Sequence, residues 1–135
     1  MAVKQLTVFL ENQQGQLVQA TDLLAKNGID MRALSIADTQ DFGILRLIVN
    51  DTEKALSILK SNDYLVQITE VVGAAIPDRP GELTRALSLL NEANINLEYL
   101  YAFLTNTEGS AQMVFRVADN DAAGKVLQEA GYEIL

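Results

Sequence analysis

The chain contains an internal repeat, which constrains its fold more than any other feature of the sequence. Gly15 and Gly81 stand 66 residues apart, and each opens a stretch whose apolar residues recur at the spacing of one helix face. Seven identical pairs occur at this offset between positions 15 and 34: Gly15/Gly81, Leu17/Leu83, Ala20/Ala86, Leu23/Leu89, Leu24/Leu90, Ile29/Ile95 and Leu34/Leu100. Self-similarity at a fixed period indicates two copies of one structural unit.

The second half of each copy repeats as well, at an offset of 68 residues. The matching pairs are Asp51/Asp119, Ala55/Ala123, Leu59/Leu127 and Tyr64/Tyr132. The change from 66 to 68 indicates a turn that is two residues longer in the second copy. We therefore expect two domains, residues 1–70 and 71–135. Because units of this size bury little surface alone, we expect the copies to share a sheet or a core.

Each copy shows the order β-α-β-β-α-β. In the first copy the patterns predict strands at 4–10, 29–38, 42–49 and 64–72 and helices at 15–27 and 51–62. In the second they predict a first strand near 73–77, helices at 81–93 and 120–130, and strands at 95–104, 111–117 and 132–135. The fold class is then α+β: a ferredoxin-like βαββαβ unit repeated twice, with antiparallel sheets and the helices on one face.

The predicted strand 95–104 is apolar on both sides. Leu97, Tyr99, Tyr101 and Phe103 alternate with Leu100, Ala102 and Leu104. A strand with one solvated face would alternate apolar with polar residues. Two interpretations remain open at this point: a bulge that switches faces partway, or a second sheet, from this chain or another, that covers the outer face.

Composition excludes several functions. The chain has 18 acidic and 10 basic residues, a net charge of −8, which argues against nucleic acid and anionic membranes because both require Lys and Arg to neutralise phosphates. It has no Cys and no His, which removes thiolate and imidazole chemistry and Cys/His metal sites, so we expect no metal and no cofactor. No apolar run approaches the length of a membrane span, and the start does not resemble a signal peptide. We expect a cytoplasmic protein.

The turn before the first helix of each copy has the character of an anion site. A strand that passes through a glycine into a helix leaves N–H groups at the helix start without partners, and these groups suit a carboxylate. Asn12 and Asp78 open the two turns. They could contact a ligand, or they could be simple helix caps, which would still leave N–H groups for a ligand.

The segment Asp78-Arg79-Pro80-Gly81-Glu82-Leu83, the later Ala93-Asn94-Ile95-Asn96-Leu97 and the βαββαβ order resemble the ACT domain. The resemblance covers essentially the whole chain as two ACT domains in tandem, with the second copy the closer match. It implies a regulatory protein without catalytic activity that binds an amino acid or similar metabolite between ACT units. It also implies a homodimer or higher homo-oligomer and allows a separate metabolic enzyme as partner.

By the same resemblance, ligand contacts come from the turn before the first helix and from the start of the second strand. Carried onto this sequence, the turn contacts are Asn12, Gln13, Gly15, Gln16 and Leu17 in the first copy and Asp78, Arg79, Pro80, Gly81, Glu82 and Leu83 in the second. The strand contacts are Asp30 and Asn96. The turn N–H groups would hold the carboxylate of an amino acid, and the Asp and Asn oxygens would accept from its ammonium group.

Three other functions are weighed against this one. A purely structural oligomerisation module would have the same fold with empty sites. A small enzyme would require a nucleophile or an acid–base pair, and no carboxylate here stands beside an evident nucleophile. An RNA-recognition module shares the topology, but Tyr99, Tyr101 and Phe103 are its only hint, and the acidic charge opposes it.

Overall fold

The computed structural model describes residues 3–11, 13–39, 42–105 and 107–135. This part of the chain contains seven strands and four helices. It divides into two compact units. The N-terminal unit is Lys4–Thr69, and the C-terminal unit is Glu70–Leu135 together with Val3.

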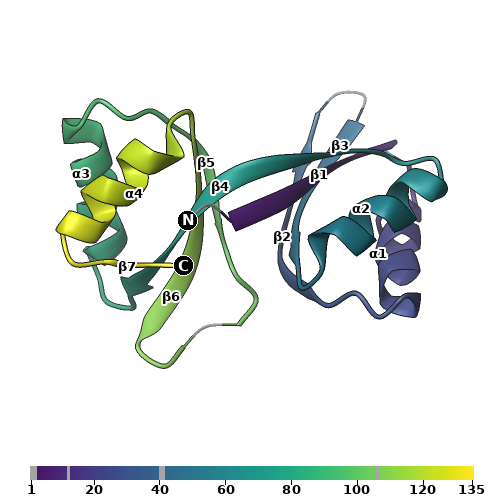
Figure 1. Ribbon diagram of the computed structural model, residues 1–135, viewed down its shortest axis with the longest axis horizontal. Coiled ribbons are helices and arrows are strands. Elements are labelled where there is room, and N and C mark those ends of the chain that lie inside the picture. Colours follow the sequence, from purple (N-terminus) through teal and green to yellow (C-terminus); the bar gives the residue numbers. More distant parts are fainter. Residues whose placement is uncertain (1–2, 12, 40–41, 106) are drawn as a thin grey trace. The chain divides into compact units, whose positions relative to one another are not determined.

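The N-terminal unit is an antiparallel sheet with two helices on one face (Figure 1). Its strands follow the order β2-β3-β1-β4 across the sheet. Its elements are β1 (Val3–Glu11), α1 (Gln16–Lys26), β2 (Met31–Asp38), β3 (Phe42–Val49), α2 (Thr52–Ser61) and the first residues of β4 (Leu65–Pro77). The predicted βαββαβ order and the placement of both helices on one face are confirmed.

The C-terminal unit repeats this arrangement, with the rest of β4 as its first strand. The strand order is β7-β4-β6-β5, and α3 and α4 cover one face (Figure 1). Its other elements are α3 (Glu82–Glu92), β5 (Leu97–Ala102), β6 (Ser110–Val117), α4 (Asn120–Glu129) and β7 (Glu133–Ile134). The strands predicted at 64–72 and near 73–77 form one continuous strand, β4.

The matching residues of the repeat build matching cores. In each unit an Ala and a Leu from each helix are buried against the sheet, and this spacing gives a helix one apolar stripe. These residues are Ala20, Leu24, Ala55 and Leu59 in one core and Ala86, Leu90, Ala123 and Leu127 in the other. The second helix of each unit also starts in the same way, since Asp51 accepts from the Lys54 N–H at 3.1 Å and Asp119 from the Ala122 N–H at 3.0 Å.

A β-bulge accounts for part of the strand that is apolar on both sides. The register of β5 against β6 shifts between Leu97, which lies opposite Val117, and Tyr99, which lies opposite Arg116. The extra residue brings Leu97 and Leu100 to the same side, where both pack against the helix-covered core. The predicted bulge is therefore present and accounts for Leu97, whereas Tyr99 and Tyr101 stay on the other side of the strand, where their ring centroids lie 6.4 Å apart. Coverage of the outer face by another sheet stays a prediction.

Candidate functional site

The turn of the C-terminal unit enters α3 through a left-handed glycine. Gly81 has φ 87° and ψ −12° and is the N-cap of α3, with no side chain bonded to the helix start. The interpretation of Asp78 as a helix cap is therefore wrong. The helix begins four residues after Asp78, at Glu82, and the Asp78 N–H instead donates to the Gly109 carbonyl at 2.9 Å. A residue with a side chain at Gly81 would strain the turn.

Two N–H groups at the start of α3 are available to a ligand. The Glu82 N–H is used inside the turn, where it donates to the Arg79 carbonyl at 3.2 Å. The N–H groups of Leu83 and Thr84 find no acceptor among the described residues. The predicted anion site thus has one N–H donor fewer than expected, because the Glu82 N–H is already used.

The turn of the N-terminal unit has the same backbone. Gly15 has φ 89° and ψ −11° and is the N-cap of α1, again without a side-chain bond. The Gln16 N–H donates to the Gln13 carbonyl at 3.3 Å, while those of Leu17 and Val18 meet no acceptor in the described part of the chain. Asn12, the remaining predicted contact of this turn, lies outside the described residues. Among the described residues, both copies therefore present two N–H groups without an acceptor at the start of one helix.

Side chains of the C-terminal unit hold its turn in place. Arg79 Nη2 lies 2.9 Å from Glu82 Oε1, so two predicted ligand contacts pair with each other. The Tyr132 hydroxyl donates to the Glu82 carbonyl at 3.4 Å. Arg85 lies over the Tyr132 ring, 5.0 Å from its centroid, and donates to the Ala130 carbonyl at 3.2 Å. The first turn of α3 is thereby tied to the end of α4.

Arg85 and Tyr132 hold the turn in place but were not predicted from the sequence. One signal was present, because Tyr132 repeats Tyr64 at the 68-residue offset, and a repeated aromatic residue beside a helix end indicates a fixed contact. Arg85 carried no such signal, since Gln19 stands at the matching position.

The predicted strand contacts lie far from the turn contacts within one unit. Asn96 follows the C-terminal end of α3, and Gly81 precedes its N-terminal end. Eleven helical residues separate the two, which at 1.5 Å per residue is about 16 Å. Asp30 and Gly15 are separated by α1 in the same way. No single unit therefore brings its own turn and strand residues together.

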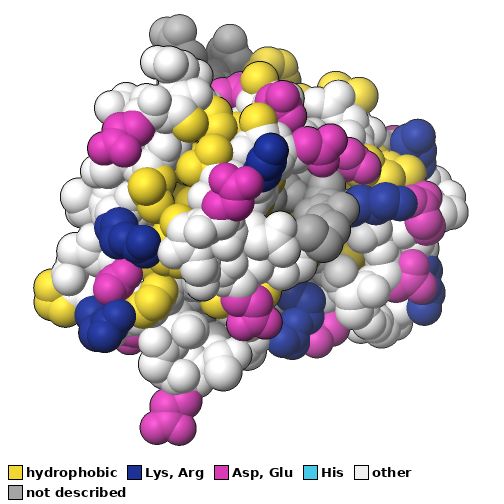
Figure 2. All heavy atoms as spheres, turned by 60° about the vertical axis from the view of Figure 1, so that its left-hand side comes forward, with side chains coloured by type: hydrophobic (Ala, Val, Ile, Leu, Met, Phe, Trp, Pro, Cys, Tyr) yellow, Lys and Arg dark blue, Asp and Glu magenta, His cyan; other side chains and the backbone are white. Residues whose placement is uncertain are grey.

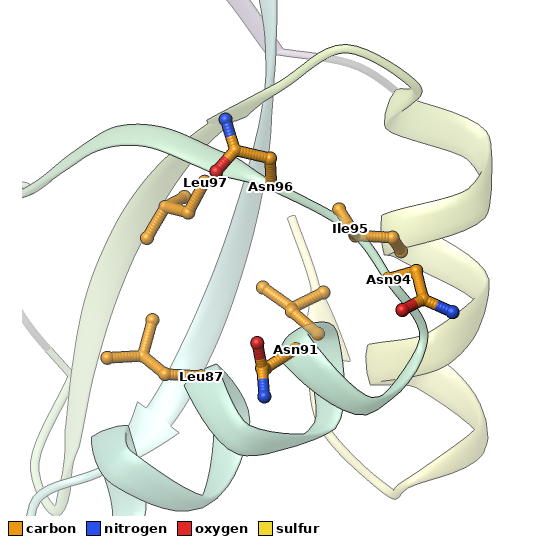
Figure 3. Close-up of a pocket in the computed structure, with 7 residues that line it drawn as sticks. Leu87, Asn91, Asn94, Ile95, Asn96 and Leu97 are labelled. Carbon is orange, nitrogen blue, oxygen red and sulfur yellow. The ribbon is translucent and has the colours of Figure 1, made fainter.

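Asn96 borders a cavity of about 410 Å³ at the end of α3. Figure 3 shows side chains from α3 and from the segment that leads into β5 around this space. Leu87 and Leu97 give it apolar walls, and Asn91, Asn94 and Asn96 supply amides. Asn94 has φ 60°, a left-handed conformation in which Asn is tolerated and which ends the helix. The exposed lining of the cavity is more polar than apolar, whereas most small-molecule sites are predominantly apolar.

A second cavity, of about 310 Å³, borders the turn of the N-terminal unit. Gln16, a predicted contact, is one of its lining residues. Aromatic and aliphatic side chains and two carboxylates line the rest: Phe9, Leu10, Phe42, Tyr64, Leu65, Glu11 and Asp63. The turn of the first copy thus adjoins a ligand-sized space, whereas the turn of the second is braced by its own side chains.

The described residues hold no group of three or more Asp, Glu, His or Cys side chains that could bind a metal ion. Within the same part of the chain, no helix combines the length and the apolarity that a membrane span requires.

The family model that describes an ACT domain pair matches residues 1–134. The chain belongs to the ACT domain family. The ACT pair superposes on the crystal structure of a protein from Bacteroides thetaiotaomicron with a TM-score of 0.92 and 41% identity, over 100% of this chain and 92% of that one. No curated protein sequence matches the chain.

The fold of the ACT pair is also similar to that of two regulatory subunits of aspartate kinase. The subunit from Thermus thermophilus, in its ligand-free form, gives a TM-score of 0.71 at 13% identity and covers 95% of this chain and 92% of that one. The subunit from Thermus flavus gives 0.65 at 14% identity, over 94% and 91%. At these identities the likeness establishes the fold, tandem ferredoxin-like ACT domains, and no more.

Proposed function

We propose that this ACT domain pair is a regulatory protein that binds an amino acid and has no catalytic activity of its own. One observation carries the proposal: both copies enter their first helix through a left-handed glycine. Two N–H groups follow it in each copy, at Leu17 and Val18 and at Leu83 and Thr84, and meet no acceptor among the described residues. The positive end of the helix dipole adds to these donors, so a carboxylate is the ligand group that suits the turn.

The rest of an amino acid requires an acceptor for its ammonium group. Asp30 and Asn96 supply such oxygens, but each lies at the far end of the helix from its own turn. We propose that a strand start from a different copy of the fold completes each site, which makes ligand binding depend on how copies associate. A ligand that prefers one association over another would shift the population toward it. We also propose a homodimer or higher oligomer, which would supply the second copy, a separate metabolic enzyme as partner, and a cytoplasmic location.

A thermal-shift screen of the twenty amino acids tests the ligand class. A cognate amino acid at about a hundred times its dissociation constant should stabilise the folded state by about 2.7 kcal/mol. We expect one or a few clear shifts. Absence of any shift at millimolar concentration would count against an amino-acid ligand and would favour a structural module with empty sites.

The turn itself is tested by Gly81→Val and Gly15→Val. An added Cβ meets no protein atom within 4 Å at either position, so each variant should fold while valine moves the backbone from its left-handed conformation and displaces the N–H groups. We expect the ligand response to vanish in one or both. Gly28→Val is the matched control, since Gly28 also has positive φ, 74°, and open space but lies at the other end of α1. A normal response in Gly81→Val and Gly15→Val would exclude the turns as the site.

The distribution of charged side chains on the surface does not favour nucleic-acid binding. Figure 2 shows Lys and Arg side chains scattered singly among Asp and Glu over the face it presents, rather than gathered in a basic stripe. With a net charge of −8, salt-dependent RNA binding is not expected.

A further inference from the structure

The C-terminal unit places one of its own guanidinium groups on a tyrosine. Arg85 Cζ lies 5.0 Å from the centre of the Tyr132 ring, within the range of a cation–π contact. Arg85 Nη2 also donates to the carbonyl of Ala130, the C-cap residue of α4, at 3.2 Å. The group therefore has both a ring face and a helix C-terminal carbonyl, two partners that favour a cation.

The N-terminal unit keeps the tyrosine and the carbonyl but lacks the arginine. α1 and α3 have eleven residues each and begin directly after Gly15 and Gly81, so Gln19 corresponds to Arg85. The Tyr64 N–H donates to the Leu59 carbonyl at 3.0 Å, as the Tyr132 N–H does to that of Leu127 at 3.1 Å.

The carbonyl corresponds as well. Asn62 is the C-cap residue of α2, as Ala130 is of α4, so the Asn62 carbonyl takes the position of the Arg85 acceptor.

A cavity of about 290 Å³ lies at this position of the N-terminal unit. Its lining includes Gln19, Asn62 and Tyr64, the counterparts of the arginine, of its acceptor and of its ring. The other lining residues are Asp22, Leu23 and Lys26. The space that an arginine fills in one unit is therefore open in the other.

Two charges stand at this cavity. Lys26 Nζ pairs with Asp22 Oδ2 at 2.9 Å, and the side chains are 73% and 55% exposed. Such an exposed pair is weak and exchanges readily with solvent. The Asp22 carboxylate can thus also accept from an incoming cation.

We propose that this cavity, the Tyr64 cavity, binds the guanidinium group of a small molecule. A planar guanidinium can lie on the Tyr64 ring and donate at its edge to the Asn62 carbonyl, as Arg85 does in the other unit, whereas an ammonium group cannot stack in this way. The volume suits a guanidinium with a short aliphatic chain rather than a larger body. The site is separate from the helix-start turns and does not depend on the amino-acid proposal.

NMR titration of the ¹⁵N-labelled full chain tests the ligand class. Ethylguanidinium should shift the signals of Gln19, Asn62 and Tyr64 with a millimolar dissociation constant. n-Propylammonium should bind more weakly, and neutral ethylurea should cause no shift. Equal shifts from ethylurea, or none from ethylguanidinium, would overturn the proposal. A blocked Gly-Arg-Gly peptide is the last ligand to be titrated. Binding of the peptide without binding of ethylguanidinium would assign the cavity to a protein partner and overturn the small-molecule site.

Exchanging the residue types of Gln19 and Arg85 tests where ethylguanidinium binds. Gln19→Arg should fill the Tyr64 cavity from within and weaken ethylguanidinium binding by about tenfold or more. Ala25→Arg is the control, because it adds the same charge to another exposed position of α1. Arg85→Gln should open the equivalent cavity and produce new ethylguanidinium shifts at Tyr132. Unchanged binding in Gln19→Arg, or equal weakening in both arginine variants of α1, would place the ligand elsewhere.

Discussion

The two units share a backbone and differ in what their side chains do with it. Both enter the first helix through a left-handed glycine, at φ 89° and φ 87°, and both cap the second helix with an aspartate. Around the turn they diverge. The C-terminal unit ties Glu82 to Tyr132 and covers that tyrosine with Arg85, whereas cavities border Gln16 and Gln19 in the N-terminal unit.

This comparison separates two kinds of constraint. Identity at the glycines and caps reflects backbone geometry, since few residues can adopt a left-handed turn or accept from a helix start without cost. The difference between Gln19 and Arg85 arises because both positions are exposed, so the fold can form with either residue there. The left-handed turn at the start of the first helix is thus common to both units, while access to the space around it is specific to each. We infer that the units share a type of ligand group but differ in what else they can bind.

The largest difference between the units should appear when a residue of β4 is replaced by the residue at the matching position of β1. Gly73 matches Thr7 at the 66-residue offset, but a Cβ at Gly73 would lie 3.1 Å from Leu135 Cβ and 3.2 Å from Val3 Cγ2. Gly73→Thr should therefore destabilise the C-terminal unit by about 1–3 kcal/mol through overpacking. Urea unfolding followed through the NMR signals of each unit measures this loss.

Gly43→Ala is the control for that variant. Its Cβ would meet Ile36 Cδ1 at 3.6 Å, an ordinary contact, so we expect almost no loss. Equal losses in the two variants would show that close packing is not what reserves Gly73 for glycine.

A smaller effect is expected in the second helices. Gly124 lies inside α4, where α2 carries Leu56, and an added Cβ meets nothing within 4 Å. Gly124→Ala should stabilise the C-terminal unit by about 0.5–1 kcal/mol, because glycine loses the most backbone entropy in a helix. The same urea measurement applies, with Ala122→Gly as the opposite change in the same helix. A loss of stability in Gly124→Ala would mean that α4 needs the flexibility of glycine at this position.

The smallest effect concerns the residue after each second helix. Asp63 has φ 66°, and its counterpart Gly131 has φ 97°. Asp63→Gly relieves a left-handed aspartate but raises the entropy of the unfolded chain, so a net gain of only about 0.5 kcal/mol is expected. Gly131→Asp should lose a similar amount. Differential scanning calorimetry compares the two. If Asp63→Gly loses stability, the Asp63 carboxylate, which lines the cavity beside Gln16, has a structural role that the backbone does not reveal.

The fold was accessible from the sequence because its signals are local and occur twice. Alternating apolar residues, helix-face spacing and the left-handed glycines each act within a few residues, and the repeat confirmed one copy by the other. The site was accessible only in part. The glycine turns were correctly expected to lead into helices, but the pairing of Arg79 with Glu82 and the use of the Glu82 N–H depend on side-chain positions that spacing does not specify.

The sequence by itself determined two βαββαβ units of the ACT family and a matched helix entrance in each, because backbone conformation follows from residue type over short range. Only the tertiary structure decided which N–H groups stay unused, that Asn96 lies a helix length from Gly81, and that Arg85 fills beside Tyr132 a space left open beside Tyr64. Contacts between residues 45 or more positions apart, such as Arg85 with Ala130, arise from packing, and packing depends on the positions of whole elements rather than on local spacing.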